Sequence, residues 1–138
     1  MSLPVTSWEH AEPFVLLVDD ERHVTEIVGR RLGSAGCRVQ SACDGQAALE
    51  TARRARPNLI ITDLDMPRMT GLELALAVQA DPQLKGVPVL LLSARGFTVS
   101  HADLEAANIR RVIEKPFSAR KVVEAALSAL GLEGKAAA

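Results

Sequence analysis

Residues 59–71 of the chain read LIITDLDMPRMTG, and the predicted fold is built outward from them. A β-branched, apolar run leads directly into Asp63 and is then stopped by Pro67 and Gly71. This pattern predicts a buried strand that ends at Asp63 and is followed by a loop. In an open sheet of parallel strands, ligands bind at the carboxyl ends of the strands, so Asp63 is a candidate functional residue.

A second apolar run, residues 14–18 (FVLLV), ends in the same way, at Asp19 and Asp20. If the two strands are neighbours, three carboxylates meet at one edge of the sheet. Like charges at short distance repel and raise each other's pKa, so such a group is unfavourable by itself. A hard divalent cation with oxygen ligands would relieve the repulsion. We therefore predict that Asp19, Asp20 and Asp63 bind Mg²⁺.

Length and charge exclude several classes of protein. The 138 residues suffice for one domain with a substantial core. A formal net charge of −1 gives no general attraction to nucleic acid or anionic membranes, so we expect direct binding to neither. No apolar run approaches the ~18 residues of a membrane-spanning helix, and the amino terminus lacks the pattern of a signal peptide. These observations predict a cytoplasmic chain.

Apolar runs and amphipathic stretches alternate along the chain, which predicts an α/β fold. We expect strands at 14–18, 38–42, 59–63, 87–92 and 110–113. We expect helices at 21–35, 45–54, 72–80, 99–107 and 119–130. The alternation predicts a doubly wound, three-layer sandwich around a parallel sheet with right-handed crossovers. The expected organisation is an N-terminal tail at 1–13, one domain at 14–130 and a C-terminal tail or linker at 131–138.

Two further strand ends carry polar groups. Ser93 follows the run Leu90-Leu91-Leu92, and Lys115 follows Val112-Ile113-Glu114. Alone, Ser93 could be an ordinary turn residue and Lys115 a surface cation. Together they add a hydroxyl and an ammonium group to the sheet edge that carries the carboxylates. Groups of these kinds bind Mg²⁺ and phosphoryl oxygens, so we predict a site for phosphoryl chemistry.

In combination, these residues resemble the receiver domain of two-component response regulators. The resemblance covers residues 14–130. The motifs that carry it are Asp19-Asp20, the run from Asp63 to Gly71 with its Met66-Pro67, Ser93-Ala94, and Lys115-Pro116-Phe117. The resemblance implies a flavodoxin-like, five-stranded parallel sheet of order 2-1-3-4-5. It also implies a cis peptide bond between Lys115 and Pro116.

The same resemblance implies a role for each site residue. Asp63 would accept a phosphoryl group from a histidine kinase or a histidine phosphotransfer protein, and Ser93 and Lys115 would contact that group. The implied Mg²⁺ ligands are the carboxylates of Asp19, Asp20 and Asp63 and the backbone carbonyl of Asp65. The chain would be no enzyme beyond catalysing its own phosphorylation and dephosphorylation. A homodimer through the face of the last helix, strand and helix is a further option.

One position departs from the family pattern. Val112 stands where the family usually has Tyr or Phe, a side chain whose rotation reports phosphorylation. Val112 is stiff and short, so we expect the signal to leave through the segment after Ser93. There Phe97 either takes over part of the role of the missing aromatic residue or packs at the edge of the core. We also expect Asp65 to pair with Arg95 across the site and slow hydrolysis.

Two other functions compete with a phosphorylated receiver. The run Asp63-Leu64-Asp65 could serve a phosphatase of the haloacid-dehalogenase type, with Asp63 as nucleophile and Asp65 as acid or base. Such enzymes usually begin with this motif, whereas here it lies in the middle of the chain. The third option is a receiver-like binding module that is not phosphorylated. Its mark would be the loss of an essential Asp or Lys, and none is lost.

Overall fold

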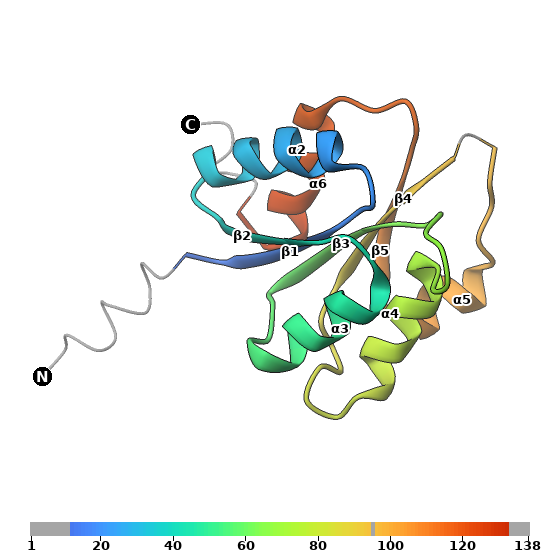
Figure 1. Cartoon of the computed structure of the whole chain (residues 1–138). Coiled ribbons are helices and arrows are strands. Elements are labelled where there is room, and N and C mark those ends of the chain that lie inside the picture. Colours follow the sequence, from blue (N-terminus) through green and yellow to red (C-terminus); the bar gives the residue numbers. More distant parts are fainter. Residues whose placement is uncertain (1–11, 95, 133–138) are drawn as a thin grey trace, which may run out of the picture.

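The computed structural model describes residues 12–94 and 96–132 (Figure 1). Its strands are β1 (Phe14–Val18), β2 (Arg38–Ala42), β3 (Leu59–Asp63), β4 (Val89–Ser93) and β5 (Ile109–Glu114). Its helices are α2 (Arg22–Ser34), α3 (Gly45–Arg54), α4 (Gly71–Ala80), α5 (His101–Ala106) and α6 (Ala119–Ala129). No helix in this described part is long and apolar enough to cross a membrane.

The five strands form one parallel sheet of order β2-β1-β3-β4-β5, which confirms the predicted fold. β1 lies between β2 and β3, with Val18 opposite both Ala42 and Thr62. Because β1 and β3 are neighbours in register, the residues that follow Val18 and Thr62 emerge side by side. The topology alone therefore brings Asp19 and Asp63 together.

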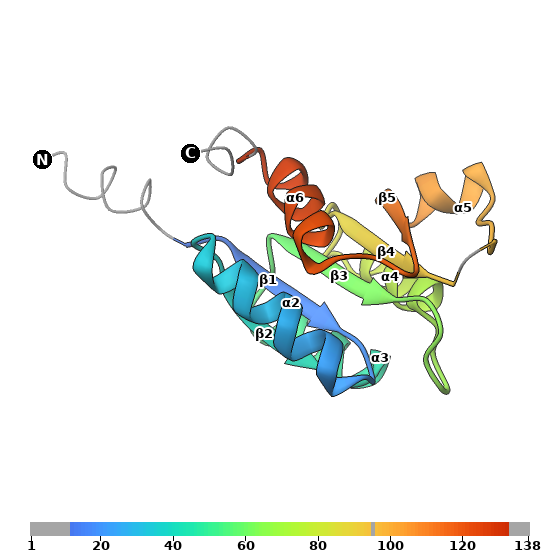
Figure 2. The same ribbon diagram turned by 90° about the horizontal axis from the view of Figure 1, so that it is seen from above.

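Helices cover both faces of the sheet (Figures 1 and 2). α2 and α6 pack on one face, and α3, α4 and α5 lie on the other. All five residues of β1, of β3 and of β4 are buried, as expected for central strands between two helical layers. Each helical layer closes its own apolar core against the sheet. The sheet is thus a rigid support for the residues at its carboxyl edge.

Some boundaries differ from the prediction. β4 begins at Val89 and not at residue 87, because Pro88 has no N–H to donate to a neighbouring strand. α5 is shorter than the predicted helix at 99–107, since the Ser100 side chain accepts from the N–H of Asp103 and fixes its first turn. β5 contains a bulge, at which Leu90 of β4 pairs with Arg111 and Arg110 has no opposite residue.

Most of both expected tails lies outside the described residues. Pro13, at the end of the expected N-terminal tail, accepts a 2.8 Å hydrogen bond from the N–H of Arg38. This bond therefore fixes β1 beside β2 from the first residue of both strands.

Candidate functional site

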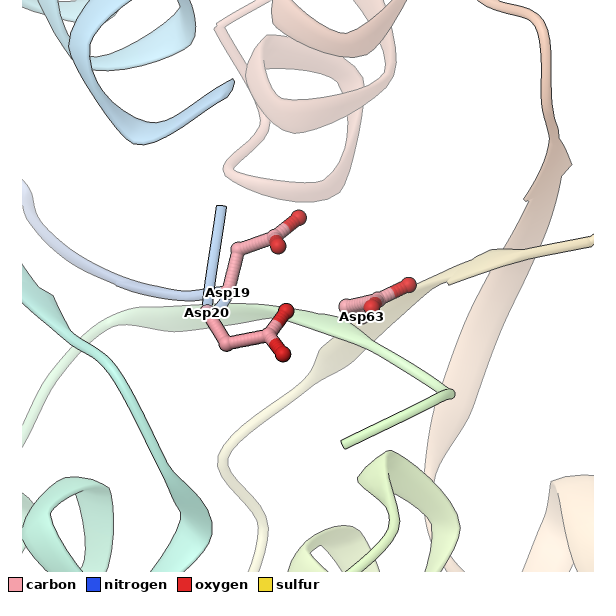
Figure 3. A group of neighbouring side chains, drawn as sticks. All are labelled: Asp19, Asp20 and Asp63. Atoms are coloured by element: carbon pink, nitrogen blue, oxygen red, sulfur yellow. The ribbon is translucent and has the colours of Figure 1, made fainter. Parts of the chain in front are cut away.

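Three carboxylates meet at the carboxyl edge of the sheet. Asp19 and Asp20 follow β1 and Asp63 ends β3, and one oxygen of each lies within 4.8 Å of the others (Figure 3). Asp19 and Asp63 are each only 2% exposed, whereas Asp20 is open to solvent. This is the grouping that the sequence predicted, with one open side from which a ligand can enter.

The acidic group is held by backbone contacts. The N–H of Asp19 donates to the carbonyl oxygen of Ala42 on β2 at 3.1 Å, and Oδ1 of Asp19 accepts from the N–H of Glu21 at 2.9 Å. On β3, the hydroxyl of Thr62 donates to the carbonyl oxygen of Asp63 at 3.0 Å. These contacts hold the carboxyl group of Asp19 and the backbone of both residues before any ligand is bound.

The acidic group is electrostatically unfavourable as it stands. Burial, and to a lesser degree the charge of Asp63, raise the pKa of Asp19 to about 6, although the bond from the Glu21 N–H works against this. Burial also raises the pKa of Asp63, and the charges of Asp20 and Asp65 act in the same direction. The nearby Lys115 opposes this rise only in part. Both carboxyl groups would therefore be stabilised by an added positive charge.

Lys115 supplies one positive charge to the site. Its Nζ lies 3.0 Å from Oδ1 of Asp63 and 3.8 Å from Oε1 of Glu21. The Asp63 contact is a close ion pair with a nearly fully buried carboxylate. Burial lowers the pKa of Lys115, but the contact with Asp63 and the charges of Asp19 and Glu21 outweigh it, so its pKa is raised and the ammonium stays charged.

The peptide bond between Lys115 and Pro116 is cis, as the resemblance implies. Ser93 and Lys115 meet at this edge of the sheet, where the N–H of Lys115 donates to the carbonyl oxygen of Ser93 at 2.8 Å. Ser93 is fully buried, and its hydroxyl donates to the carbonyl oxygen of Ala94 at 3.3 Å. This long bond leaves the hydroxyl free to exchange its partner for a better acceptor.

Asp65 lies in the loop after β3, and its side chain is exposed. Its neighbours Leu64 and Met66 are buried, at 4% and 7% exposed, so they anchor the backbone on both sides of it. Within the described part of the chain, no hydrogen bond reaches the carbonyl oxygen of Asp65. The expected pairing with Arg95 cannot be placed, because Arg95 lies outside the described residues.

The acidic group has the chemistry of a Mg²⁺ site. Among the described residues, Oδ2 of Asp19 is buried without a hydrogen-bond partner, and Oδ1 of Asp63 is buried with only its ion pair to Lys115. Buried polar atoms normally have a partner, so the acidic group fits a bound cation. Carboxylate and carbonyl oxygens suit a hard ion such as Mg²⁺.

Three features of the site escaped the sequence reasoning. Glu21 is a second partner for Lys115, and its position directly after the Asp pair was an available signal. Gly71 lies so close to the backbone of Asp63 that a Cβ would overlap the Asp63 carbonyl oxygen. Met69 covers Gly45 at the start of α3. The last two contacts join separate segments, and no local pattern announces them.

A cavity of about 710 Å³ lies beside the site, between β5 and the loop after β4. Phe97, Val99, Val112 and Lys115 are among its lining residues. Phe97 is 47% exposed and belongs to neither apolar core, whereas Val99 and Val112 pack against the core on the α3 and α4 face. The structure therefore gives no support to the option that Phe97 packs at the core edge.

Known proteins resemble this chain in sequence. Residues 15–127 match the family described as response regulator receiver domain. The chain is 32% identical over 111 residues to chemotaxis protein CheY of Pseudomonas aeruginosa, which covers 80% of this chain and 90% of that protein. It is 33% identical over 114 residues to hybrid signal transduction histidine kinase D of Dictyostelium discoideum, covering 83% of this chain and 7% of the kinase.

Solved structures agree with this result. The structure of Vibrio cholerae chemotaxis protein CheY4 has 33% sequence identity and a TM-score of 0.76, over 86% of this chain and 99% of that chain. The chain spans only a small part of some curated relatives, such as the 7% of the Dictyostelium kinase and 34% of a protein-glutamate methylesterase of Anaeromyxobacter dehalogenans. The shared unit is thus found both nearly alone and inside much longer proteins.

Proposed function

Because the chain belongs to the response regulator receiver family, we propose that it is a phosphorylation-activated signalling module whose acceptor is Asp63. The observation that carries the proposal is the meeting of three carboxylates with the ammonium of Lys115 at one sheet edge. One similar protein is a hybrid histidine kinase, which supports a histidine kinase or a histidine phosphotransfer protein as the donor.

The reaction is an in-line transfer between two side chains. A carboxylate oxygen of Asp63 attacks the phosphorus of a phosphohistidine, the P–N bond breaks, and its electron pair leaves with the imidazole. The product is an aspartyl phosphate. Attack by water returns the carboxylate and releases inorganic phosphate, so the modification is a timed signal.

The charges around Asp63 support this reaction. Nζ of Lys115, 3.0 Å from Oδ1, is placed to stabilise negative charge on the transferring oxygens. Asp19, Asp20 and Asp63 would hold Mg²⁺ together with the backbone carbonyl of Asp65. When bound, Mg²⁺ would neutralise further charge on the phosphoryl oxygens. Ser93 would then turn its hydroxyl from Ala94 towards the phosphoryl group and start the response in the segment after β4.

The position of Asp65 does not favour a phosphatase of the haloacid-dehalogenase type. That reaction needs the Asp65 carboxylate beside the one of Asp63, as acid or base. The Asp65 side chain is exposed and stands outside the group formed by Asp19, Asp20 and Asp63. A receiver-like module that is not phosphorylated has no need of Lys115 in contact with a buried Asp63.

One experiment separates the three functions. The protein is incubated with Mg²⁺ and a small acyl phosphate donor, and its intact mass is followed over time, with Asp63→Asn as the control. A transient gain of one phosphate that requires Asp63 supports the proposal. Continuous turnover of an unrelated phosphomonoester would identify a phosphatase instead, and an unchanged mass with every donor would identify a binding module.

A further inference from the structure

We propose that Met69 is a positioning residue, whose contact with Gly45 holds the course of loop 64–70 from which the carbonyl oxygen of Asp65 would reach a bound Mg²⁺. The inference rests on the proposed function, because it concerns the carbonyl oxygen that Asp65 would offer to Mg²⁺. Neither Gly45 nor Met69 is one of the three residues of the acidic group. The contact joins the loop after β3 to the first residue of α3, an element that carries none of the proposed ligands.

Gly45 and Met69 are in unusually close contact. A Cβ atom at Gly45 would lie 2.5 Å from Sδ, 2.9 Å from Cγ and 3.0 Å from Cβ of Met69. Gly45 is buried at the first position of α3, and Met69 packs against the same core. The backbone of Gly45 is ordinary helix, so no conformational need accounts for a glycine here. The absent side chain is explained by the room that Met69 occupies.

The loop that Met69 holds is tightly turned. Arg68, which precedes it, has φ of 69°, a region that residues other than glycine rarely adopt. The N–H of Met69 donates to the carbonyl oxygen of Pro67 at 2.7 Å, which closes the turn. Such a conformation persists only where surrounding contacts impose it. Leu64 and Met66 fix the start of the loop in the core, and the Met69 side chain packs its far end against the same core.

The test measures Mg²⁺ affinity by calorimetry in the parent, Gly45→Ala, Met69→Ala, the double variant and Met69→Leu. We expect Gly45→Ala and Met69→Ala each to weaken Mg²⁺ binding about tenfold, the lower end of the range for residues that support metal ligands indirectly. Because both changes break the same contact, Gly45→Ala should cost less than about twofold when Met69 is already Ala. Met69→Leu, which keeps a large side chain, should bind nearly as the parent does.

Two further measurements exclude a merely structural effect. In the metal-free protein, Gly45→Ala should speed amide exchange at Met69 and Gly71 more than at residues of β1. In the phosphorylation assay, it should raise the Mg²⁺ concentration at half-maximal rate, while the rate at saturating Mg²⁺ recovers. The matched control is Gly33→Ala in α2, where an added Cβ meets no atom within 4 Å, and it should change neither quantity.

The outcomes are distinguishable. If the parent binds no Mg²⁺ at all, the metal site of the proposed function fails and this inference fails with it. If the parent binds Mg²⁺ and Gly45→Ala binds it equally well, only the inference is overturned. The same holds if Gly45→Ala weakens binding by the same factor whether residue 69 is Met or Ala.

Discussion

The loops after β3 and β4 follow neighbouring strands at the carboxyl edge of the sheet but are held in different ways. The loop after β3 buries Leu64 and Met66, and the N–H of Gly71 closes it onto the carbonyl oxygen of Leu64 at 2.9 Å. The loop after β4 exposes Phe97 and has Gly96 at φ of 82°. In this loop, the N–H of Gly96 donates to the exposed carboxylate of Glu114 at 3.2 Å.

This difference divides the edge into a fixed and an adjustable side. Burial and backbone contacts restrain the β3 loop, so it suits residues that must keep their geometry during chemistry. Among its described residues, the β4 loop exposes the Phe97 ring and is bonded to an exposed carboxylate, which is typical of segments that move in switches. Phosphorylation at Asp63 would therefore occur beside the restrained loop after β3, and the resulting conformational change would occur in the adjustable loop after β4.

The largest effect is expected from a change that breaks the fixed side. In Gly71→Ala, the new Cβ would overlap the Asp63 carbonyl oxygen and lie 3.0 Å from Cδ1 of Leu91. Neither backbone nor a buried side chain can yield easily, so we expect a loss of about 3 kcal/mol in the free energy of unfolding. Urea unfolding measures it.

The control for Gly71→Ala is Gly96→Ala in the loop after β4. An added Cβ at Gly96 meets no atom within 4 Å, so Gly96→Ala should cost only about 1 kcal/mol for its positive φ. Equal losses for Gly71→Ala and Gly96→Ala would remove the distinction between the two loops.

Asp20→Ala tests the proposed Mg²⁺ ligand on the loop after β1. Asp20 is exposed, so its loss should leave the fold intact but remove one proposed Mg²⁺ ligand. We expect Mg²⁺ binding and the phosphorylation rate to fall by more than about tenfold, measured by calorimetry and intact mass. Glu26→Ala, an exposed change on α2, is the matched control. Phosphate uptake by Asp20→Ala at the parental rate would show that the metal assignment is wrong.

Metal removal should make the stability of the protein depend on pH in an unusual direction. Asp19 in the folded, metal-free protein holds its proton up to a pH of about 6, whereas the unfolded chain releases it near the ordinary value of 3.8. The folded state thus binds more protons in this window, and stability must fall as pH rises from 3.8 through 6.

The size of this effect is on the order of 2 kcal/mol between pH 4 and pH 7. Urea unfolding in the presence of a chelator, compared with Asp19→Asn, isolates the share of Asp19. Added Mg²⁺ should restore stability most strongly at pH 7, where the carboxylates are charged. If Asp19→Asn has the same pH profile as the parent, Asp19 is not the group that titrates.

The smallest effect on stability is expected from a change of Phe97 in the loop after β4. Phe97→Ala should cost less than about 0.5 kcal/mol, because the ring is half exposed and outside both cores. It should still accept phosphate or beryllofluoride, but with smaller NMR shift changes across residues 99–113. Phe117→Ala, at a ring that packs against the α2 and α6 core, is the control with a larger loss of stability. Full-sized shift changes in Phe97→Ala would exclude Phe97 from the readout.

The acidic group could be predicted from the sequence because its position follows from the order of the strands. Apolar runs that stop at Asp19 and Asp63 predict buried strands, and once β1 and β3 are neighbours their ends must meet. Lys115 and Ser93 follow by the same argument from β5 and β4. No side-chain detail was needed for this part of the prediction.

What the sequence could not supply were contacts that no local pattern announces. Gly71 reads as a turn residue, yet its role is to let Asp63 approach within the same loop, and Gly45 reads as an ordinary residue after a helix cap although it contacts Met69. The predicted start of β4 lies two residues early because Val87 is apolar and buried without being paired in the sheet. Burial and strand pairing usually coincide, and here Pro88 separates them.

The bulge in β5 has a consequence for how copies of this chain meet at high concentration. Within the described residues, β2 and β5 each pair on one side only, so both present free backbone groups. Arg110 and Arg111 are exposed on β5, and Arg38 and Gln40 on β2. Charged side chains and bulges block the edge-to-edge pairing of sheets that leads to aggregation. We therefore expect the two edges of the sheet to resist pairing with other copies of the chain.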